Sequence, residues 1–190
     1  MIQRTLVLIK PDGVAKGLVG EIVNRLEKIG LKIIGMKMQT VDREFAQNHY
    51  PVTDEWFNKV GNNTLSDSAK YGVSAKKHFD TEDAVKIGRK VHEWNVDYLT
   101  SGPVIAIVLE GVHAIENVRK LAGHTVPILS PPGTIRGDLA YHSALSSNIQ
   151  KRAIYNLIHS SGNKEEAERE IRLWFAETEI YDYRHVNEFI

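Results

Sequence analysis

The stretch Val104-Ile-Ala-Ile-Val-Leu109 is the clearest buried strand in this sequence. A continuous apolar run has no polar face to present to solvent, so it is typical of a strand that is covered on both sides of its sheet. Ser101-Gly-Pro103 introduces this run and favours a turn before it. A second apolar run, Leu6 to Ile9, is closed by Pro11-Asp-Gly13. The sequence therefore predicts two strands that are buried on both faces.

Helices are predicted between and after these strands. Apolar residues recur at helical spacing from Leu18 to Ile29, and Gly30 stands where a C-terminal cap is expected. The other expected elements are, in order, a strand over residues 32–41, a short helix capped by Asp42 and reaching His49, a helix over 114–121, a strand over 138–142 and a helix over 164–175. Strands that alternate with helices predict an α/β (α+β) fold. The order of elements suits a ferredoxin-like split βαβ core, with an antiparallel sheet covered by helices.

Two segments fit that core poorly. Residues 58–75 are polar and rich in Gly, Asn and Ser, and beyond them Thr81 can cap a helix that carries an apolar stripe from Ala84 to Tyr98. Residues 141–155 hold a second possible helix. We interpret these segments as surface insertions of about 58–95, which is helical, and 141–153, within a single domain of residues 1–190.

Composition excludes several classes of function. The 24 basic and 24 acidic side chains cancel, so no global attraction to nucleic acid or to an anionic membrane is expected. There is no cysteine, which excludes disulfides, thiolate metal sites and cysteine nucleophiles. The apolar run at the N-terminus is interrupted by Arg4 and is too short for a signal peptide or a membrane span. We therefore expect a cytoplasmic protein.

Cations at loop ends suggest phosphate recognition. Lys10 follows a predicted buried strand, and strand ends commonly deliver functional groups. Arg136 lies in Pro131-Pro-Gly-Thr-Ile-Arg136-Gly-Asp138, where two prolines and two glycines constrain the backbone around one cation. Guanidinium groups match phosphate geometry bidentately, and lysine adds a point charge. Taken singly, each residue is more simply a solvated cation, and no G-x-x-x-x-G-K-[ST] P-loop is present.

His159 is a candidate nucleophile, because neutral imidazole can attack phosphorus near physiological pH. One ring nitrogen must then be held, ideally by a carboxylate. Glu168 and Glu170 flank the apolar stripe of the following helix on opposite sides, and periodicity does not choose between them. Three aromatic residues, Tyr50, Trp56 and Phe57, lie close together in the sequence. An exposed ring among them can stack on a base, although core packing is their ordinary role.

Six motifs occur in an order that resembles the nucleoside diphosphate kinase family. They are Lys10-Pro-Asp-Gly13, Gly17-Leu-Val-Gly-Glu-Ile22, His49-Tyr50, Ser101-Gly-Pro103, Pro132-Gly-Thr-Ile-Arg-Gly-Asp138 and Asn156-Leu-Ile-His159-Ser-Ser161. The resemblance continues into Glu166-Ala-Glu-Arg-Glu-Ile171, Leu173-Trp-Phe175 and Ile180-Tyr-Asp-Tyr183. It implies an enzyme that moves a γ-phosphoryl group from ATP or another nucleoside triphosphate to nucleoside diphosphates. The transfer is ping-pong through a phosphohistidine, and it maintains NTP and dNTP pools.

The resemblance also implies roles for individual residues. His159 is the nucleophile, Glu170 holds its far nitrogen, and Ser161 and Lys10 assist. The implied nucleotide-binding residues are Lys10, Tyr50, Arg119, Thr125, Arg136 and Asn156, with the base stacked on either Trp56 or Phe57. Mg²⁺ is the implied cofactor, held by nucleotide phosphates and water, with no direct protein ligand predicted. A homo-oligomer is implied, a hexamer before a tetramer or a dimer, with no nucleic-acid or membrane partner.

The turn after the histidine departs from the family pattern. Where the family usually reads His-Gly-Ser-Asp, this chain reads His159-Ser-Ser-Gly162. Ser160 adds a side chain, and Gly162 removes a carboxylate that can help with metal or water. Because His159 and Glu170 are both present, we expect activity to survive. The rival interpretation is a nucleotide-binding module that has lost turnover.

Overall fold

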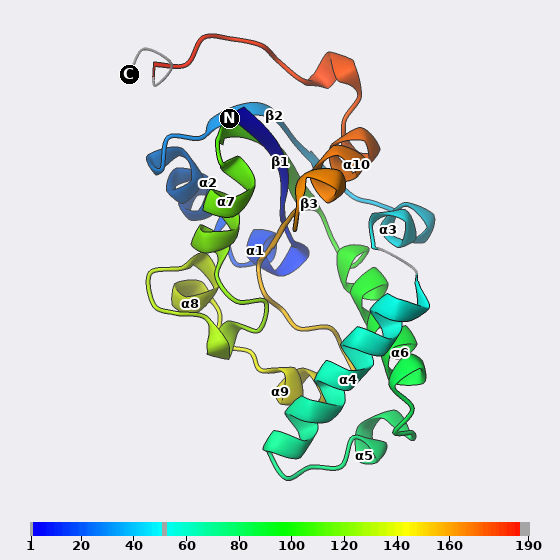
Figure 1. Ribbon diagram of the computed structural model, residues 1–190. Helices are drawn as coiled ribbons and strands as arrows, with labels where there is room; N and C mark the ends of the chain where they lie inside the picture. The colour runs from blue at the N-terminus through cyan, green and yellow to red at the C-terminus, as the bar shows by residue number, and fades with distance from the viewer. Residues whose placement is uncertain (1, 51–52, 187–190) are drawn as a thin grey trace. The chain divides into compact units, whose positions relative to one another are not determined.

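Two compact units divide the chain, and each is assembled from segments that are distant in the sequence. The computed structural model describes residues 2–50 and 53–186. The sheet unit comprises Met1–Thr40, Pro103–Ala140 and Asn156–Ile190, and the helical unit comprises Val41–Gly102 and Tyr141–Tyr155 (Figure 1). Each unit has its own apolar cluster. The single domain expected from the sequence stays a prediction.

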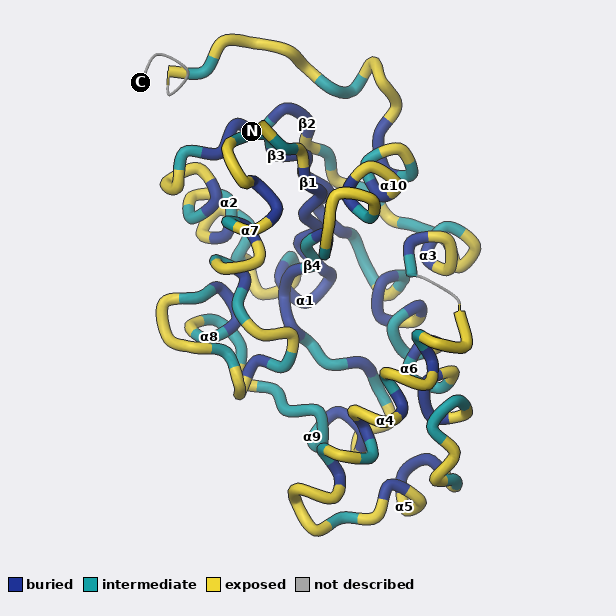
Figure 2. Tube along the Cα trace, in the orientation of Figure 1, coloured by how far each residue is buried: buried dark blue, intermediate teal, exposed yellow. Residues whose placement is uncertain are grey.

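The sheet unit is built on four strands, β1 (Ile2–Ile9), β2 (Lys32–Gln39), β3 (Val104–Val112) and β4 (Ile158–Ser160). They hydrogen-bond in the order β2-β3-β1-β4, and each neighbouring pair is antiparallel. The two apolar runs of the sequence lie in the central strands β1 and β3, which Figure 2 shows as largely buried. The ferredoxin-like antiparallel sheet expected from the sequence is confirmed.

Helices cover this sheet because strand residues alternate between its faces. Val7 and Ile9 of β1 join a buried cluster with apolar residues of two helices, α2 (Val19–Lys28) and α7 (Ala114–Ala122). Leu6 and Leu8 point to the opposite face and are also fully buried. The remaining elements of this unit are α1 (Pro11–Ala15), the 3₁₀ helices Pro127–Leu129 and Glu177–Glu179, α8 (Ile135–Leu139) and α10 (Lys164–Trp174), the last of which packs against β1.

The strand predicted over residues 138–142 is wrong. The chain there completes α8 and continues without a strand. The cause is a local cap, because the Thr134 side chain accepts a hydrogen bond from the Gly137 N–H and starts a helix after the proline-rich entry. A short helix also replaces the simple turn suggested at Pro11, since proline at the first helical position presets the backbone angle φ.

The helical unit contains α3 (Arg43–His49), α4 (Asp54–Lys70), α5 (Lys76–Phe79), α6 (Ala84–Leu99) and α9 (Ala144–Ile149). Asp42 caps α3 as predicted, because its carboxylate accepts from the Phe45 N–H. The predicted cap of α6 at Thr81 is wrong by two residues. Asp83 caps this helix by accepting from the Lys86 N–H, while the Thr81 hydroxyl accepts from the Asp83 N–H.

Glycines let α4 and α6 approach each other closely. A Cβ atom added to Gly61 would lie 1.8 Å from the Ala84 carbonyl oxygen, and one added to Gly88 would lie 2.1 Å from the Phe57 carbonyl oxygen. Both contacts are to backbone atoms, which cannot move aside as a flexible side chain can. The two helices therefore meet backbone against backbone, at positions where only glycine fits.

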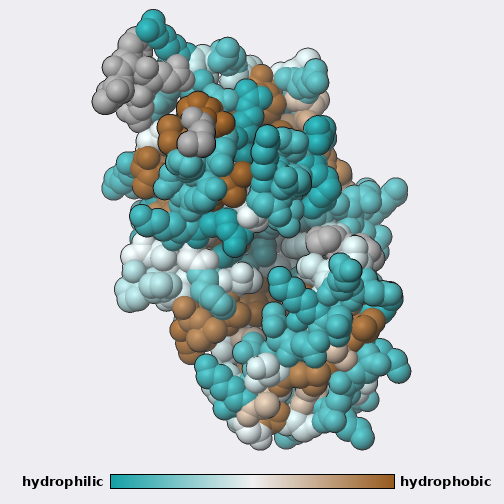
Figure 3. Space-filling view, in the orientation of Figure 1, coloured by the Kyte–Doolittle hydropathy of each residue, from teal (hydrophilic) through white to brown (hydrophobic). Residues whose placement is uncertain are grey.

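The surface carries no sign of a membrane span. Among residues 2–50 and 53–186, no helix combines the length and the apolar character that crossing a bilayer requires. Hydrophilic side chains cover most of the face seen in Figure 3, and the apolar ones gather in separate patches.

Candidate active site

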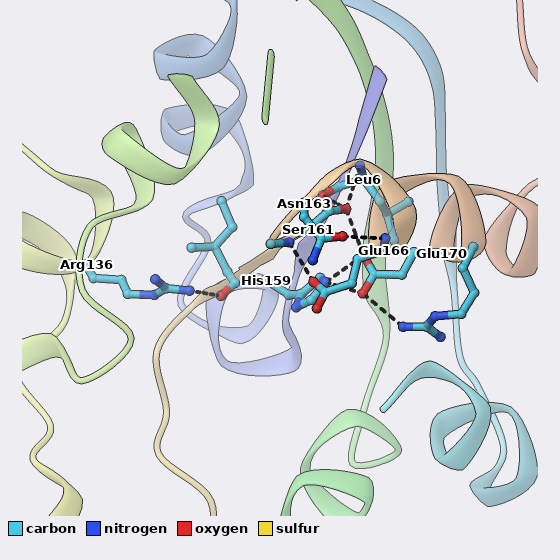
Figure 4. Close-up of polar contacts among 10 residues, drawn as sticks. Leu6, Arg136, His159, Ser161, Asn163, Glu166 and Glu170 are labelled. Atoms are coloured by element: carbon cyan, nitrogen blue, oxygen red, sulfur yellow. Dashed lines mark hydrogen bonds and ion pairs between the residues drawn. The ribbon is translucent and has the colours of Figure 1, made fainter. Parts of the chain in front are cut away.

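A histidine and a buried carboxylate meet at β4. The ladder between β1 and β4 places His159 opposite Leu8. Glu170, on α10, points its carboxylate at the imidazole, and both carboxylate oxygens lie 3.0 Å from the ring nitrogen Nε2 (Figure 4). With Nε2–H donating to this carboxylate, the ring orientation is fixed and Nδ1 becomes the nitrogen that can act as a nucleophile.

Ser161 connects this pair to the sheet. Its hydroxyl donates to Glu170 Oε2 at 2.8 Å and accepts from the Leu6 N–H at 3.2 Å. Burial is the largest influence on the pKa of Glu170 and would raise it. The charge of His159 and the hydrogen bonds from His159 and Ser161 outweigh burial, so the pKa lies below its ordinary value. The carboxylate is therefore ionised at neutral pH and can hold a positively charged imidazole.

The structure separates the two glutamates that helical periodicity left equivalent. Glu170 is 2% exposed and contacts His159. Glu168 is exposed and faces Lys164 and Arg172 at 3.8 Å and 3.9 Å instead. Of the two, Glu170 is the carboxylate that lies against the histidine.

Lys10 is a buried cation at the end of β1. Its ammonium donates to Asn156 Oδ1 at 2.9 Å, and the Asn156 amide donates in turn to the Thr125 carbonyl at 2.9 Å. Burial, followed by the charge of Arg136, lowers the pKa of Lys10 from 10.5 to about 7, although Asp12 opposes the change. An amine with this lowered pKa takes up a proton more readily when an anion arrives, which suits a phosphate-binding lysine.

Arg136, at the start of α8, hydrogen-bonds to the backbone of two other segments. Its guanidinium donates to three carbonyl oxygens, those of Gly123 at 2.7 Å, Asn156 at 3.2 Å and Ile158 at 2.7 Å. The side chain is 6% exposed. Whatever it contributes to phosphate binding, Arg136 ties the loop after α7 to the segment that enters β4, directly before His159.

The segment before the histidine contains a strained residue that the sequence did not reveal. Leu157 has a φ of 68°, in the left-handed region that leucine rarely adopts, and the Ile158 N–H bonds back to the Asn156 carbonyl at 2.7 Å. Contacts on both sides of Leu157 hold this turn, because Lys10 N–H donates to its carbonyl at 2.8 Å and its own N–H donates to Asp12 at 3.3 Å. Leucine carries no local signal for this conformation, and neither Leu157 nor Asp12 was singled out from the sequence.

Arg119 and Thr125 lie nearer the surface. Both are exposed, and within the part of the chain that the structure describes the Arg119 guanidinium makes no hydrogen bond or ion pair. One guanidinium nitrogen, Nη1, lies 3.4 Å from the position that a Cβ on Gly162 would take. The structure thus brings Lys10, Thr125, Arg136 and Asn156 into one bonded network, and it places Arg119 beside the turn that follows His159.

The predicted aromatic residues all belong to the helical unit. Phe57 is 3% exposed, and the Arg89 guanidinium lies 4.6 Å from its ring centre. Trp56 and Tyr50 are half-buried, and both pack edge-on against His92. Phe57 is therefore a core residue of this unit, and Trp56 has the more accessible ring.

The polar side chains of the candidate site in the sheet unit suit a metal ion that arrives already bound to a phosphate-containing substrate. The buried carboxylate Glu170 accepts from His159 and Ser161, and Asp12 accepts from the Gly13 and Leu157 N–H groups. The candidate phosphate-binding side chains are cations and neutral hydroxyl or amide groups. Mg²⁺ keeps several waters and binds phosphates readily, so it fits here as an ion carried by a nucleotide.

Comparisons with known proteins place this chain beside one family. A sequence model of the family described as nucleoside diphosphate kinase matches residues 3–91 and 67–180. A nucleoside diphosphate kinase of Pyrobaculum aerophilum is 43% identical over 95% of this chain and 99% of its own length. One of Borreliella burgdorferi is 40% identical over 99% of this chain and 96% of its own length.

Solved structures give the same result. A crystal structure of an NDP kinase from Pyrobaculum aerophilum has a TM-score of 0.92 at 42% identity, covering 96% of this chain and 100% of that one. A nucleoside-diphosphate kinase from Borrelia burgdorferi, described as a transition-state mimic with bound vanadate and ADP, has a TM-score of 0.77 at 38% identity. It covers 98% of this chain and 95% of that one.

Proposed function

This chain belongs to the nucleoside diphosphate kinase family, and from that premise we propose that it transfers the γ-phosphoryl group of ATP, or of another nucleoside triphosphate, to nucleoside diphosphates. Through this reaction it maintains NTP and dNTP pools. The observation that carries the proposal is the bond between His159 Nε2 and the buried carboxylate of Glu170. It holds one ring nitrogen and so directs the other toward a substrate.

In the first half-reaction, the lone pair of His159 Nδ1 attacks the γ-phosphorus in line with the bridging oxygen. The bond between that oxygen and the γ-phosphorus breaks, and the oxygen leaves with the electron pair as the terminal oxygen of the diphosphate. The ring becomes a phosphorylated imidazolium, and its Nε2–H remains hydrogen-bonded to the Glu170 carboxylate. Glu170 is the counter-charge at this stage, and Ser161 keeps its oxygen in place.

In the second half-reaction, a terminal oxygen of another diphosphate attacks the phosphohistidine. The bond between nitrogen and phosphorus breaks, and its electron pair returns to Nδ1. The first diphosphate leaves before the second one binds in the same site, and the phosphohistidine carries the group between the two steps, which makes the mechanism ping-pong. Phosphoryl transfer demands mainly positioning and positive charge around the transferred group.

The proposed nucleotide site combines cations and neutral donors. Lys10, Arg119 and Arg136 bind phosphates, and Thr125 and Asn156 bind phosphate or ribose. Tyr50 is a further nucleotide-binding residue of this proposal, and Trp56, which is more accessible than Phe57, is the residue proposed to stack on the base. Stacking is tolerant of base identity and accommodates both purines and pyrimidines. Mg²⁺, bound to the phosphates and water, neutralises phosphate charge.

We further propose a homo-oligomer, a hexamer before a tetramer or a dimer, that works in the cytoplasm without nucleic-acid or membrane partners. The support for these points is the family membership alone. Size-exclusion chromatography with light scattering measures the oligomeric state directly.

The central experiment is phosphoenzyme labelling. Incubation with ATP labelled on its γ-phosphate should leave acid-labile phosphate on the protein, and addition of a mixture of diphosphates should remove it and reveal acceptor preference. The variant His159→Ala should take up no label. If the wild type stays unlabelled while ADP raises its melting temperature, the chain is a nucleotide-binding module. If His159→Ala still takes up label, the nucleophile is another residue.

A further inference from the structure

The turn that follows His159 is held by a glutamate from the next helix. The Gly162 N–H donates to Glu166 Oε2 at 2.7 Å. The Glu166 N–H donates to Asn163 Oδ1 at 2.8 Å, and Asn163 is the N-cap residue of α10 (Figure 4). These two bonds run in opposite directions, as in a capping box, but the glutamate reaches one residue further back. Glu166 therefore ties the start of α10 to the active-site turn.

Space, and not backbone conformation, requires glycine at position 162. Gly162 is absent from the described glycines with positive φ, so its backbone would accept any L-residue. A Cβ at this position would lie 2.6 Å from Glu166 Oε2 and 3.3 Å from Glu166 Cδ. The Glu166 carboxylate thus occupies the volume into which a side chain at position 162 would project.

The same volume borders the guanidinium of Arg119. The Cβ position on Gly162 lies 3.4 Å from Arg119 Nη1. Arg119 and Gly162 line a groove of about 400 Å³, together with Lys164 and Glu116. An aspartate at position 162, which the resembled family usually carries, would bring a carboxylate to this place. In this chain the carboxylate comes from Glu166 on α10.

We propose that Glu166 is a positioning residue that takes the place of an aspartate at position 162. It fixes the turn after His159 through the Gly162 N–H. Its negative charge makes no ion pair with Arg119 in the described residues, but it attracts that guanidinium across the position that a Cβ on Gly162 would take. This inference rests on the proposed function for its kinetic part. It requires Gly162 and Glu166 to be a matched pair, in which either change alone is harmful and a combined change restores what each one loses.

Three variants test this pairing: Glu166→Ala, Gly162→Asp, and the two combined. Glu166→Ala should raise KM for ADP about threefold to tenfold, the size expected for the net loss of one ordinary hydrogen bond, and change kcat less than twofold. Gly162→Asp should lower the melting temperature by about 2–4 °C, because its side chain collides with Glu166 and repels it. The double variant should lie closer to the wild type than either single variant in both measurements.

Two matched substitutions separate charge from structure. Glu166→Gln keeps an oxygen that can accept from the Gly162 N–H but loses the charge, so KM for ADP should rise while the melting temperature stays unchanged. Glu168→Gln makes the same change at an exposed position of the same helix and should leave KM unchanged. The proposal is overturned if Glu166→Gln leaves KM within twofold of the wild type, or if the double variant is no better than Gly162→Asp.

The melting temperatures do not depend on phosphoryl transfer. If the wild type fails to take up phosphate, the proposed function is rejected, and the thermal comparison of the four proteins still decides whether Gly162 and Glu166 are paired. If the wild type is labelled and the double variant shows no recovery, only the role of Glu166 is rejected.

Discussion

The core of the sheet unit is made of aliphatic side chains, whereas α4 and α6 of the helical unit meet through their backbones. Val7, Ile107 and Leu109 are among the fully buried residues of the sheet core. In the helical unit, the contact depends on Gly61 and Gly88, where an added Cβ would collide with carbonyl oxygens. An aliphatic core can repack around a changed side chain, but a backbone contact cannot. The two units should therefore respond very differently to the addition of one methyl group.

The units also differ in whether their buried polar side chains have hydrogen-bond partners. The site residues Lys10, Asn156 and Glu170 are all hydrogen-bonded. Within the residues that the structure describes, the side-chain atoms that are buried without a hydrogen-bond partner include Ser68 Oγ, His78 Nε2 and His92 Nε2 in the helical unit. In the described part of the sheet unit, Thr5 Oγ1 is the only such atom. Each unsatisfied group costs stability. We expect the helical unit to unfold first.

The largest expected effect comes from adding one methyl group at the contact between α4 and α6. Gly61→Ala should lower the free energy of unfolding of this unit by about 3 kcal/mol, at the upper end for overpacking, because the obstacle is a backbone carbonyl. Urea unfolding can be followed in each unit separately, by fluorescence of Trp94 in the helical unit and of Trp174 in the sheet unit, with the other tryptophans replaced.

The matched control is Gly20→Ala in α2 of the sheet unit. Nothing lies within 4 Å of a Cβ at Gly20. Alanine is the better helix former, so this variant should gain about 0.5–1 kcal/mol. If both substitutions change stability by the same amount and sign, the contrast between the two units is incorrect.

The next effect concerns the site in the sheet unit. Glu170→Gln should slow phosphoryl transfer about 10–100-fold, as expected for a group that orients another, because the charge that balances the imidazolium is lost. Stopped-flow measurement of phosphoenzyme formation gives this rate. Equal rates for Glu170→Gln and the wild type would remove Glu170 from the mechanism.

Nucleotide binding should be accompanied by proton uptake at Lys10, the buried lysine of the sheet unit. The pKa of Lys10 is lowered to about 7 by burial and by Arg136, so most Lys10 ammonium groups are deprotonated at pH 8 in the empty site. Phosphate oxygens favour the charged form and raise this pKa again. ADP binding at pH 8 should therefore take up as much as about one proton. Calorimetry in buffers of different ionisation enthalpy measures it, and Lys10→Met should abolish it.

The smallest effect is a pH dependence in the helical unit. Burial lowers the pKa of His92, against a weaker opposing effect of Glu93, so the folded state binds fewer protons than the unfolded state below the ordinary value of 6.5. Stability of this unit should fall as pH falls from 6.5 toward the lowered pKa, by at most about 1.4 kcal/mol per pH unit. Denaturation of the wild type and of His92→Phe at pH 8 and pH 5.5 tests this, and parallel curves would contradict it.

Much of the sheet unit was predictable from local patterns. Continuous apolar runs located β1 and β3, and helical spacing located α2, α7 and α10. The strand expected over 138–142 does not form, because the Thr134 side chain caps a helix in that segment. A pattern of hydrophobic residues does not indicate such a cap. The short strand β4 was equally hard to delimit, since its pairing with β1 depends on residues far away in the sequence.

The site was predictable in its residue types but not in its connections. Periodicity could not choose Glu170 over Glu168, because burial of one of them is decided by the packing of α10. The strained φ of Leu157 left no trace in the sequence, as nothing in a leucine marks a left-handed residue. The role of Gly61 and Gly88 was not predicted, because their close contacts join two helices and no local pattern indicates them.

The position of β4 has a consequence for how the protein is made. Leu6 bonds to Ser161, and Lys10 bonds to Asn156, so the two ends of the chain must meet before His159 is in place. Contacts between such distant residues form slowly, since the intervening chain must first be ordered. On the ribosome, β1 is synthesised before β4 and α10, with which it must pair or pack. A nascent chain therefore lacks the bond between His159 and Glu170 until both β4 and α10 have emerged.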